Sequence, residues 1–138
     1  MTLEQTHRWE KALIGFYNLD GWQLTHTGEG FLPYDASGYT PKNQRCILEI
    51  KFRKKYYDTK VLEKAKYDKM LKVDTDCRLY FVNDPKGNYL FWLDDLKNLE
   101  LTTINLPATT YWNSKKVPTE VYLLPESKAS IVNLTADF

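Results

Sequence analysis

The alternation of apolar and polar positions divides the chain into one long helix followed by a series of strands. Between residues 2 and 18, Trp9, Ala12, Leu13 and Phe16 recur at helical spacing, and Gly21 then supplies a stop. Residues 45–53 are instead largely apolar and β-branched, as in a strand. By the same criteria the pattern predicts further strands at 22–27, 31–36, 77–83, 88–93 and 120–125.

Turn and loop signals fall between these segments. Gly38 and Pro41 indicate a loop over 37–43, and residues 84–87 predict a tight turn that joins two strands as a hairpin. A helix is expected over about 58–72, a short helical turn over 94–99, and a loop over 111–118.

Length and composition predict one compact domain spanning 1–138. With 138 residues, 43% of them hydrophobic and 14% aromatic, the chain can bury a core without disulfides. No apolar run is long enough to span a bilayer, and the N-terminus lacks the apolar core of a signal peptide, so a cytoplasmic protein is expected. Cys46 and Cys77 each lie inside a strand-like run, which favours reduced core thiols over a disulfide or a metal site.

Charge is concentrated in one segment, although the whole chain carries a formal net charge of only +1. Residues 51–72 hold nine Lys and Arg against three Asp and Glu, so the rest of the chain is net negative. A Lys-rich helix is often only a solvated surface. This one follows directly after the strand at 45–53, which carries Glu49 and Lys51, and that position favours a surface that binds the phosphate backbone of a nucleic acid. The predicted nucleic-acid contacts are Arg53, Lys54, Lys55, Lys60, Lys64 and Lys66.

Candidate chemistry lies in Asp35 and, fourteen residues later, Glu49-Ile50-Lys51. Since side chains alternate along a strand, Glu49 and Lys51 share one face, about 6–7 Å apart. A carboxylate there can bind a divalent cation while the ammonium meets the same ligand. The alternative is an ordinary Glu–Lys salt bridge on an edge strand. Burial in an apolar strand makes unpaired charges costly, and this favours a site.

The order of elements, with Asp35 and Glu49-Ile50-Lys51 in these positions, resembles the PD-(D/E)xK nuclease superfamily, and most of all its small phage-type members. The resemblance covers about residues 5–93, which leaves 94–138 as C-terminal decoration. The superfamily motif has a proline directly before the acid. Here Tyr34 directly precedes Asp35, and Pro33 stands one place earlier. Glu63 and Tyr67 occupy the spacing at which several subgroups carry Gln and Tyr, and this implies a DNA contact for Tyr67.

The resemblance implies an α/β fold with a restriction-endonuclease-like core, in the order α-β-β-β-α-β, with a mixed central sheet flanked by helices. It implies Mg²⁺ as cofactor, replaceable by Mn²⁺, bound by Asp35, Glu49 and the backbone carbonyl of Ile50. Lys51 would orient or deprotonate the attacking water, which makes Asp35, Glu49 and Lys51 the catalytic set. Glu10 on the first helix is a candidate ligand of a second metal, with a solvated helix residue as the alternative.

The function expected from these features is Mg²⁺-dependent hydrolysis of DNA to leave a 5′ phosphate, by an endonuclease that acts on duplex or branched DNA. The alternative is a non-catalytic module that binds DNA or another partner on the same scaffold. A homodimer would provide two sites for two cuts, with an interface in the aromatic-rich C-terminal third. His7 and His26 receive no role. Tyr111, Trp112, Lys115 and Lys116 combine aromatic and basic groups that could clamp nucleic acid; the alternative for Trp112, which is favoured, is a core aromatic.

Overall fold

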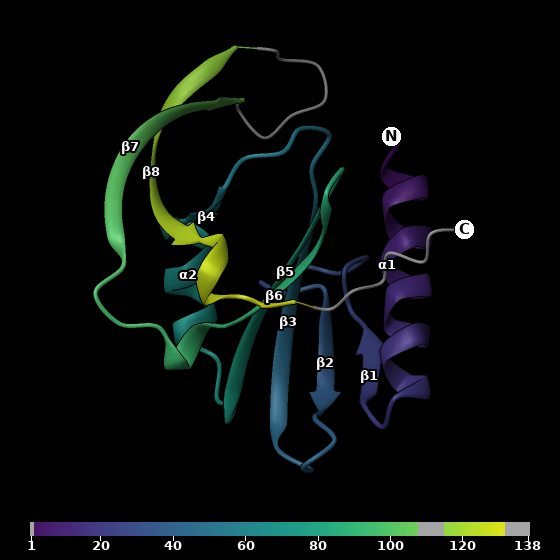
Figure 1. Ribbon diagram of the computed structural model, residues 1–138. Coiled ribbons are helices and arrows are strands. Elements are labelled where there is room, and N and C mark those ends of the chain that lie inside the picture. Colours follow the sequence, from purple (N-terminus) through teal and green to yellow (C-terminus); the bar gives the residue numbers. More distant parts are fainter. Residues whose placement is uncertain (1, 108–114, 132–138) are drawn as a thin grey trace.

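The computed structural model describes residues 2–107 and 115–131 (Figure 1). The elements follow one another along the chain as α1 (Leu3–Leu19), β1 (Gln23–His26), β2 (Ala36–Tyr39), β3 (Arg45–Phe52), β4 (Thr59–Glu63), α2 (Lys64–Leu71), β5 (Cys77–Asp84), β6 (Gly87–Trp92), the 3-10 turn η1 (Leu93–Asp95), β7 (Glu100–Pro107), β8 (Lys116–Pro125), the 3-10 turn η2 (Glu126–Lys128) and β9 (Ser130–Ile131).

The strands form two sheets. The central sheet is mixed, with strand order β1-β2-β3-β5-β6-β9; β3 and β5 run parallel and the other neighbours are antiparallel. The second sheet is antiparallel, in the order β4-β8-β7. Figure 1 shows α1 on one side of the molecule and α2 on the other, beside the long curved ribbon of β7 and β8. The predicted mixed central sheet flanked by helices is therefore confirmed.

Each face of the central sheet has its own apolar core, because successive residues of a strand point to opposite faces. On β3, Cys46, Leu48 and Ile50 pack in the core beneath α1, together with Leu13 and Tyr17 of that helix. The opposite face carries Ile47 of β3 and is covered by side chains of β4, α2 and β8, including Leu62, Met70 and Leu124. Polar side chains that follow Ile47 on this second face of β3 therefore face β4 and α2.

The first helix begins and ends where the sequence predicts. Thr2 caps its N-terminus: the Thr2 hydroxyl accepts a hydrogen bond from the Gln5 amide, and the Gln5 side chain accepts one from the Thr2 amide. Gly21, with φ of 90°, reverses the chain just after the helix. The buried face of α1 holds Leu13, Ile14 and Tyr17, and it also holds Glu10.

The strand predicted at 31–36 is wrong. Residues 31–35 form bends, and β2 lies instead at Ala36–Tyr39, mostly within the segment 37–43 that was expected to be a loop. The glycine in that segment permits close approach of two backbones: a Cβ on Gly38 would lie 1.8 Å from the Gln23 carbonyl oxygen of β1. Gly38 therefore indicates tight strand pairing here and not a turn.

The helix predicted over 58–72 is wrong in its first part. Thr59–Glu63 is the strand β4, and only Lys64–Leu71 is helical. Val61 and Leu62 pair with Leu123 and Tyr122 of β8, so a distant partner strand overrides the local helical pattern. Strand β8 also extends the predicted segment 120–125 back to Lys116, and β7 and β9 were not predicted.

Other expectations are confirmed. Strands β5 and β6 form the predicted hairpin, and η1 lies at the start of the predicted helical turn. Cys46 and Cys77 are both buried and free. Burial raises the pKa of the Cys46 thiol to about 12, which makes it an inert core group. Tyr111 and Trp112 lie outside the described residues, whereas Lys115 and Lys116 are exposed next to the start of β8.

Candidate active site

Strand β3 places Glu49 and Lys51 on one face of the sheet, as predicted from their spacing, and this is the face opposite α1. Glu49 is buried, with 7% of its surface exposed, whereas Lys51 is exposed near the end of the strand. Both side chains line a small hollow of about 30 Å³ at this point, completed by Arg53, Val61, Leu62, Glu63, Lys66 and Tyr80. Basic side chains from β3 and α2 thus border the buried carboxylate.

Asp35 lies beside β3, one residue before β2 begins. Its amide donates to the Leu48 carbonyl (2.9 Å), and its Oδ2 accepts from the Ile50 amide (2.9 Å). In a strand the N–H and C=O of one residue point toward the same neighbour, so the Ile50 carbonyl is also directed to the Asp35 side. The three groups that were predicted to bind a metal, Asp35, Glu49 and the Ile50 carbonyl, therefore adjoin one another.

Glu49 is held in an environment that disfavours its charge. Burial first, and then the neighbouring Asp35 carboxyl, raise the pKa of Glu49 to about 8, with partial compensation from Lys66 and Lys51. The Lys66 Nζ lies 3.5 Å from Glu49 Oε2, but this oxygen is buried and has no hydrogen-bond partner. A buried oxygen that accepts no hydrogen bond is rare in folded proteins, and it leaves Glu49 Oε2 able to bind a further ligand.

Glu10 comes to the other side of Asp35 from α1, and its carboxylate is buried with 4% of the residue exposed. The alternative for Glu10, a solvated helix residue, is therefore wrong. Glu10 Oε1 lies 2.8 Å from His26 Nε2, and both side chains are almost fully covered. Burial, the largest cause, raises the pKa of Glu10; the contact with His26 lowers it, and the Asp35 carboxyl adds to the increase. Glu10, Asp35 and Glu49 thus form a row of acids.

Gly28 stands at the point where Glu10, His26 and Asp35 meet. A Cβ built on Gly28 would lie 2.8 Å from Glu10 Oε1, 2.9 Å from His26 Nε2 and 3.0 Å from Asp35 Oδ1. Three polar atoms from three segments of the chain therefore converge on one position that only glycine leaves open. Sequence reasoning missed His26 and Gly28, although the glycine pair at 28 and 30 indicated an unusual backbone.

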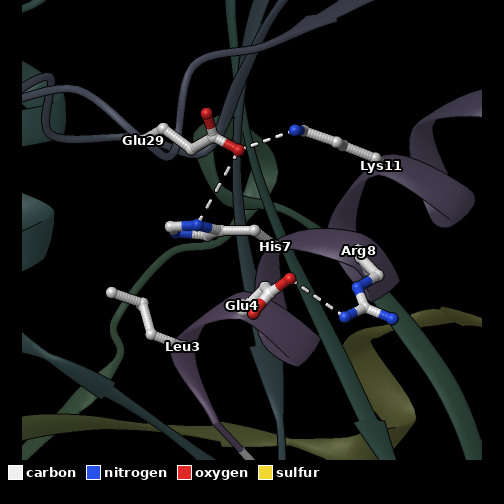
Figure 2. A pocket seen from close by; sticks show the side chains of 6 residues that line it. All are labelled: Leu3, Glu4, His7, Arg8, Lys11 and Glu29. Atoms are coloured by element: carbon white, nitrogen blue, oxygen red, sulfur yellow. Dashed lines mark hydrogen bonds and ion pairs between the residues drawn. The ribbon is translucent and has the colours of Figure 1, made fainter.

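A larger hollow of about 410 Å³ borders the Glu10 side of the site. It is lined by Leu3, Glu4, His7, Arg8, Lys11 and Glu29 (Figure 2). In Figure 2, Glu29 reaches from its loop to α1, where its carboxylate lies 2.6 Å from Lys11 Nζ and 3.9 Å from His7 Nδ1. The His7 ring centre lies 5.5 Å from that of His26, so this hollow adjoins the Glu10–His26 pair.

Five of the seven predicted nucleic-acid contacts are basic side chains that are exposed or partly exposed. Lys54 and Lys55 are exposed, and Arg53 and Lys66 are partly exposed beside Glu49. Lys64 is also partly exposed, but its Nζ lies 2.6 Å from Asp68. These five residues remain predictions as DNA contacts.

Lys60 is a correction, because its side chain points inward from β4 and only 4% of the residue is exposed. Its Nζ donates to Asp84 Oδ2 (2.6 Å) and lies 4.0 Å from the centre of the Tyr89 ring. A cation enclosed in this way cannot contact DNA. Tyr67 likewise packs inward, with its ring centre 5.5 Å from that of Tyr122, and this packing does not support the predicted DNA contact.

The acid row fits a hard divalent cation. Among residues 2–107 and 115–131, no three His, Cys, Asp or Glu side chains are grouped so as to hold a metal by themselves. Mg²⁺ does not require such a cage, since it retains several waters and is bound through one or two carboxylates. Glu49 Oε2, which accepts no hydrogen bond, lies beside Asp35 with the Ile50 carbonyl on the same side, and this arrangement matches the limited ligand set.

Comparison with known proteins gives a structural relative but no sequence relative. No protein-family model matches the chain, and no curated protein matches it. Among solved structures, the chain is similar to Hjc, a Holliday junction resolvase from the archaeal hyperthermophile Archaeoglobus fulgidus. The two share 13% sequence identity, with a TM-score of 0.58, over 91% of this chain and 89% of Hjc. At this identity the similarity establishes a shared fold.

The similarity also extends beyond residues 5–93, to which the sequence resemblance was confined, since it covers 91% of the chain. In the part of the chain that the structure describes, no helix has both the length and the apolar character needed to cross a membrane.

Proposed function

We propose that this chain, which has the restriction-endonuclease-like fold of the PD-(D/E)xK nucleases, is a Mg²⁺-dependent deoxyribonuclease. The fold predicted from the sequence and its resemblance to that superfamily are confirmed, because Hjc is a member. The function is a separate inference, and it depends on the residues of the site.

One observation carries the proposal: the buried Oε2 of Glu49 has no hydrogen-bond partner and lies next to a second carboxylate. Two adjacent carboxylates in an apolar setting repel each other, and Lys66, whose Nζ lies 3.5 Å from Glu49 Oε2, offsets only part of that cost. A divalent cation would neutralise the repulsion between the two carboxylates and would supply the contact that Glu49 Oε2 lacks. Lys51 on the same face then supplies the cationic group that a phosphodiester requires.

Each residue has a definite task in this proposal. Asp35, Glu49 and the Ile50 carbonyl would hold Mg²⁺ or Mn²⁺, with Glu10 as a further acid on the far side of Asp35. When bound, the cation supplies Lewis-acid stabilisation of the phosphate charge and lowers the pKa of a coordinated water. Lys51 orients the attacking water and offsets negative charge that develops on the phosphorane. Arg53 and Lys66 contribute positive charge at the edge of the hollow.

The substrate we propose is branched or duplex DNA, cut internally. Support comes from the fold shared with Hjc, a Holliday junction resolvase, and from the basic residues that adjoin the acid row. The predicted homodimer, which would bring two sites to one junction, remains a prediction.

A cleavage panel of single-stranded, duplex, flapped and four-way DNA tests the proposal. We expect cleavage with Mg²⁺ or Mn²⁺, none with EDTA, and a loss of at least 100-fold in Glu49→Ala at an unchanged circular dichroism spectrum. Cleavage by Glu49→Ala at the wild-type rate would contradict the assigned site. Junction binding without cleavage in any metal would instead favour a non-catalytic DNA-binding module.

A further inference from the structure

The loop between β1 and β2 carries Asp35; two hydrogen bonds close its base and a third forms a turn within it. The Thr27 amide donates to the Asp35 carbonyl (2.7 Å), the Thr27 hydroxyl donates to the Tyr34 carbonyl (3.0 Å), and the Gly30 amide donates to the Thr27 carbonyl (3.1 Å). Glu29 adds an ion pair of 2.6 Å to Lys11 of α1 (Figure 2). The tip of the loop is therefore presented from a fixed base beside the acid row.

Two large apolar side chains occupy that tip. Phe31 is fully exposed, with a relative accessibility of 109%, and Leu32 is 52% exposed. Among the described residues, no other large apolar side chain is as exposed as Phe31. Burial of a phenylalanine ring away from water is favourable, so full exposure on a braced loop leaves Phe31 available to a ligand that covers it.

Geometry limits where that ligand lies relative to the site. Phe31 is four residues from Asp35, a separation that spans at most about 14 Å of extended chain. Successive phosphates of one strand of a duplex are spaced by about 3.4 Å along the axis, so this reach corresponds to roughly four nucleotides. Whatever contacts Phe31 therefore lies close to the bond that the acid row would cleave.

Charge at the loop is compatible with DNA as that ligand. Glu29, the acid nearest the tip in sequence, is neutralised by Lys11, and this ion pair lowers the pKa of the Glu29 carboxyl. Gly28 and Gly30 carry no side chains that would oppose a phosphate. An exposed aromatic ring whose nearest acid in sequence is paired with a lysine is the type of surface on which nucleic-acid bases stack.

On the basis of the proposed nuclease function, we propose that Phe31, supported by Leu32, is an apolar wedge that stacks on a base exposed where DNA strands separate. Insertion into a continuous duplex requires unstacking of a base step, whereas a base at a junction or flap has already lost part of its stacking. The wedge therefore gives preference to branch points, and it places cleavage within about four nucleotides of the branch.

The test measures binding in Ca²⁺ or EDTA, so that it does not depend on cleavage. A four-way junction and a matched duplex would carry 2-aminopurine next to the branch position, with wild type, Phe31→Ala, Phe31→Trp and Leu19→Ala compared. Leu19 is a matched control because it is 88% exposed at the end of α1, away from the loop. We expect Phe31→Ala to reduce the junction-to-duplex affinity ratio about tenfold and to abolish the fluorescence change. Phe31→Trp should preserve both, and Leu19→Ala should alter neither.

An unchanged affinity ratio in Phe31→Ala would overturn the wedge, and so would a loss of the same size on the duplex. A change in sedimentation mass of Phe31→Ala without DNA would show that Phe31 instead contacts a second copy of the chain. These outcomes are separate from failure of the nuclease proposal, which would appear as absence of cleavage by wild type with every metal.

Discussion

Gly28 is the residue whose role the geometry defines most narrowly, because a methyl group there would meet Glu10, His26 and Asp35 at 3.0 Å or less. We predict that Gly28→Ala lowers the cleavage rate at least tenfold, since the acids must move apart to admit the methyl. Gly30→Ala is the matched control in the same loop, because its Cβ would meet only the Thr27 carbonyl oxygen, at 3.6 Å. Equal rates for the two variants, measured on the same junction substrate, would show that the cluster at Gly28 is not part of the site.

Glu49 predicts a specific dependence of stability on pH. Its pKa in the folded protein, about 8, lies above the ordinary value of 4.5, so the folded state binds the proton more tightly than the unfolded state. Its ionisation therefore destabilises the fold increasingly as pH rises from about 4.5 to about 8, and the protonated form below that window carries no such penalty.

In EDTA at pH 8, Glu49→Gln should therefore be more stable than wild type by about 1–3 kcal/mol, with a much smaller difference at pH 4.5. Urea unfolding at the two pH values measures this. Added Mg²⁺ should reduce the difference at pH 8 by stabilising wild type alone. A difference that does not change with pH would show that Glu49 ionises as an ordinary surface acid.

The positions of the candidate site residues were predictable from sequence where the alternation of side chains along a strand determines them. Ile47, Glu49 and Lys51 share a face because of their spacing, and Asp35 meets them because a neighbouring strand begins next to it. His26 and Gly28 were not predictable in this way. Their role depends on α1 lying across the end of β1, and no local pattern at either residue specifies that contact.

Among the elements, β4 differs most from its prediction, and the difference has an energetic consequence. As part of a helix, Lys60 was expected on the surface; as part of β4 it forms a buried ion pair with Asp84 at 2.6 Å. We predict that Lys60→Ala destabilises the fold by about 3–5 kcal/mol, because it leaves Asp84 charged and buried. Urea unfolding measures the change.

Lys54→Ala is the control from the same basic segment, because Lys54 is exposed. It should change the free energy of unfolding by no more than about 0.5 kcal/mol. It should instead reduce, by about one, the slope of the logarithm of DNA affinity against the logarithm of salt concentration. If Lys60→Ala were as stable as wild type, the inward placement of that side chain would be incorrect.

Elements supported by long local patterns were predictable, and those that depend on a distant partner were not. Helix α1 carries its own cap in Thr2 and its own stop in Gly21, and β3 is a largely apolar run. In contrast, β4 is a strand only because it pairs with β8, which follows more than fifty residues later. The polar, Lys-rich composition of 58–72 concealed that pairing.

At the scale of the whole molecule, two layers cover the central sheet, and they meet at the acid row. Glu10 arrives from the α1 layer, Lys66 from the α2 layer, and Glu49 from the strand between them. The order of elements predicted this arrangement in outline through the superfamily resemblance. The second sheet was not predictable, because its strand β7 pairs only with β8 and has little apolar alternation of its own.

The most direct test of the account compares two lysine variants in Mg²⁺-dependent cleavage of a four-way DNA junction. Lys51 and Lys42 are both exposed, and they lie at opposite ends of β3, the first near the acid row and the second before the strand begins. We predict that Lys51→Ala slows cleavage by about 100- to 10,000-fold while Lys42→Ala cleaves at the wild-type rate. Cleavage by Lys51→Ala as fast as by Lys42→Ala would contradict the assignment of this face of β3 as the active site.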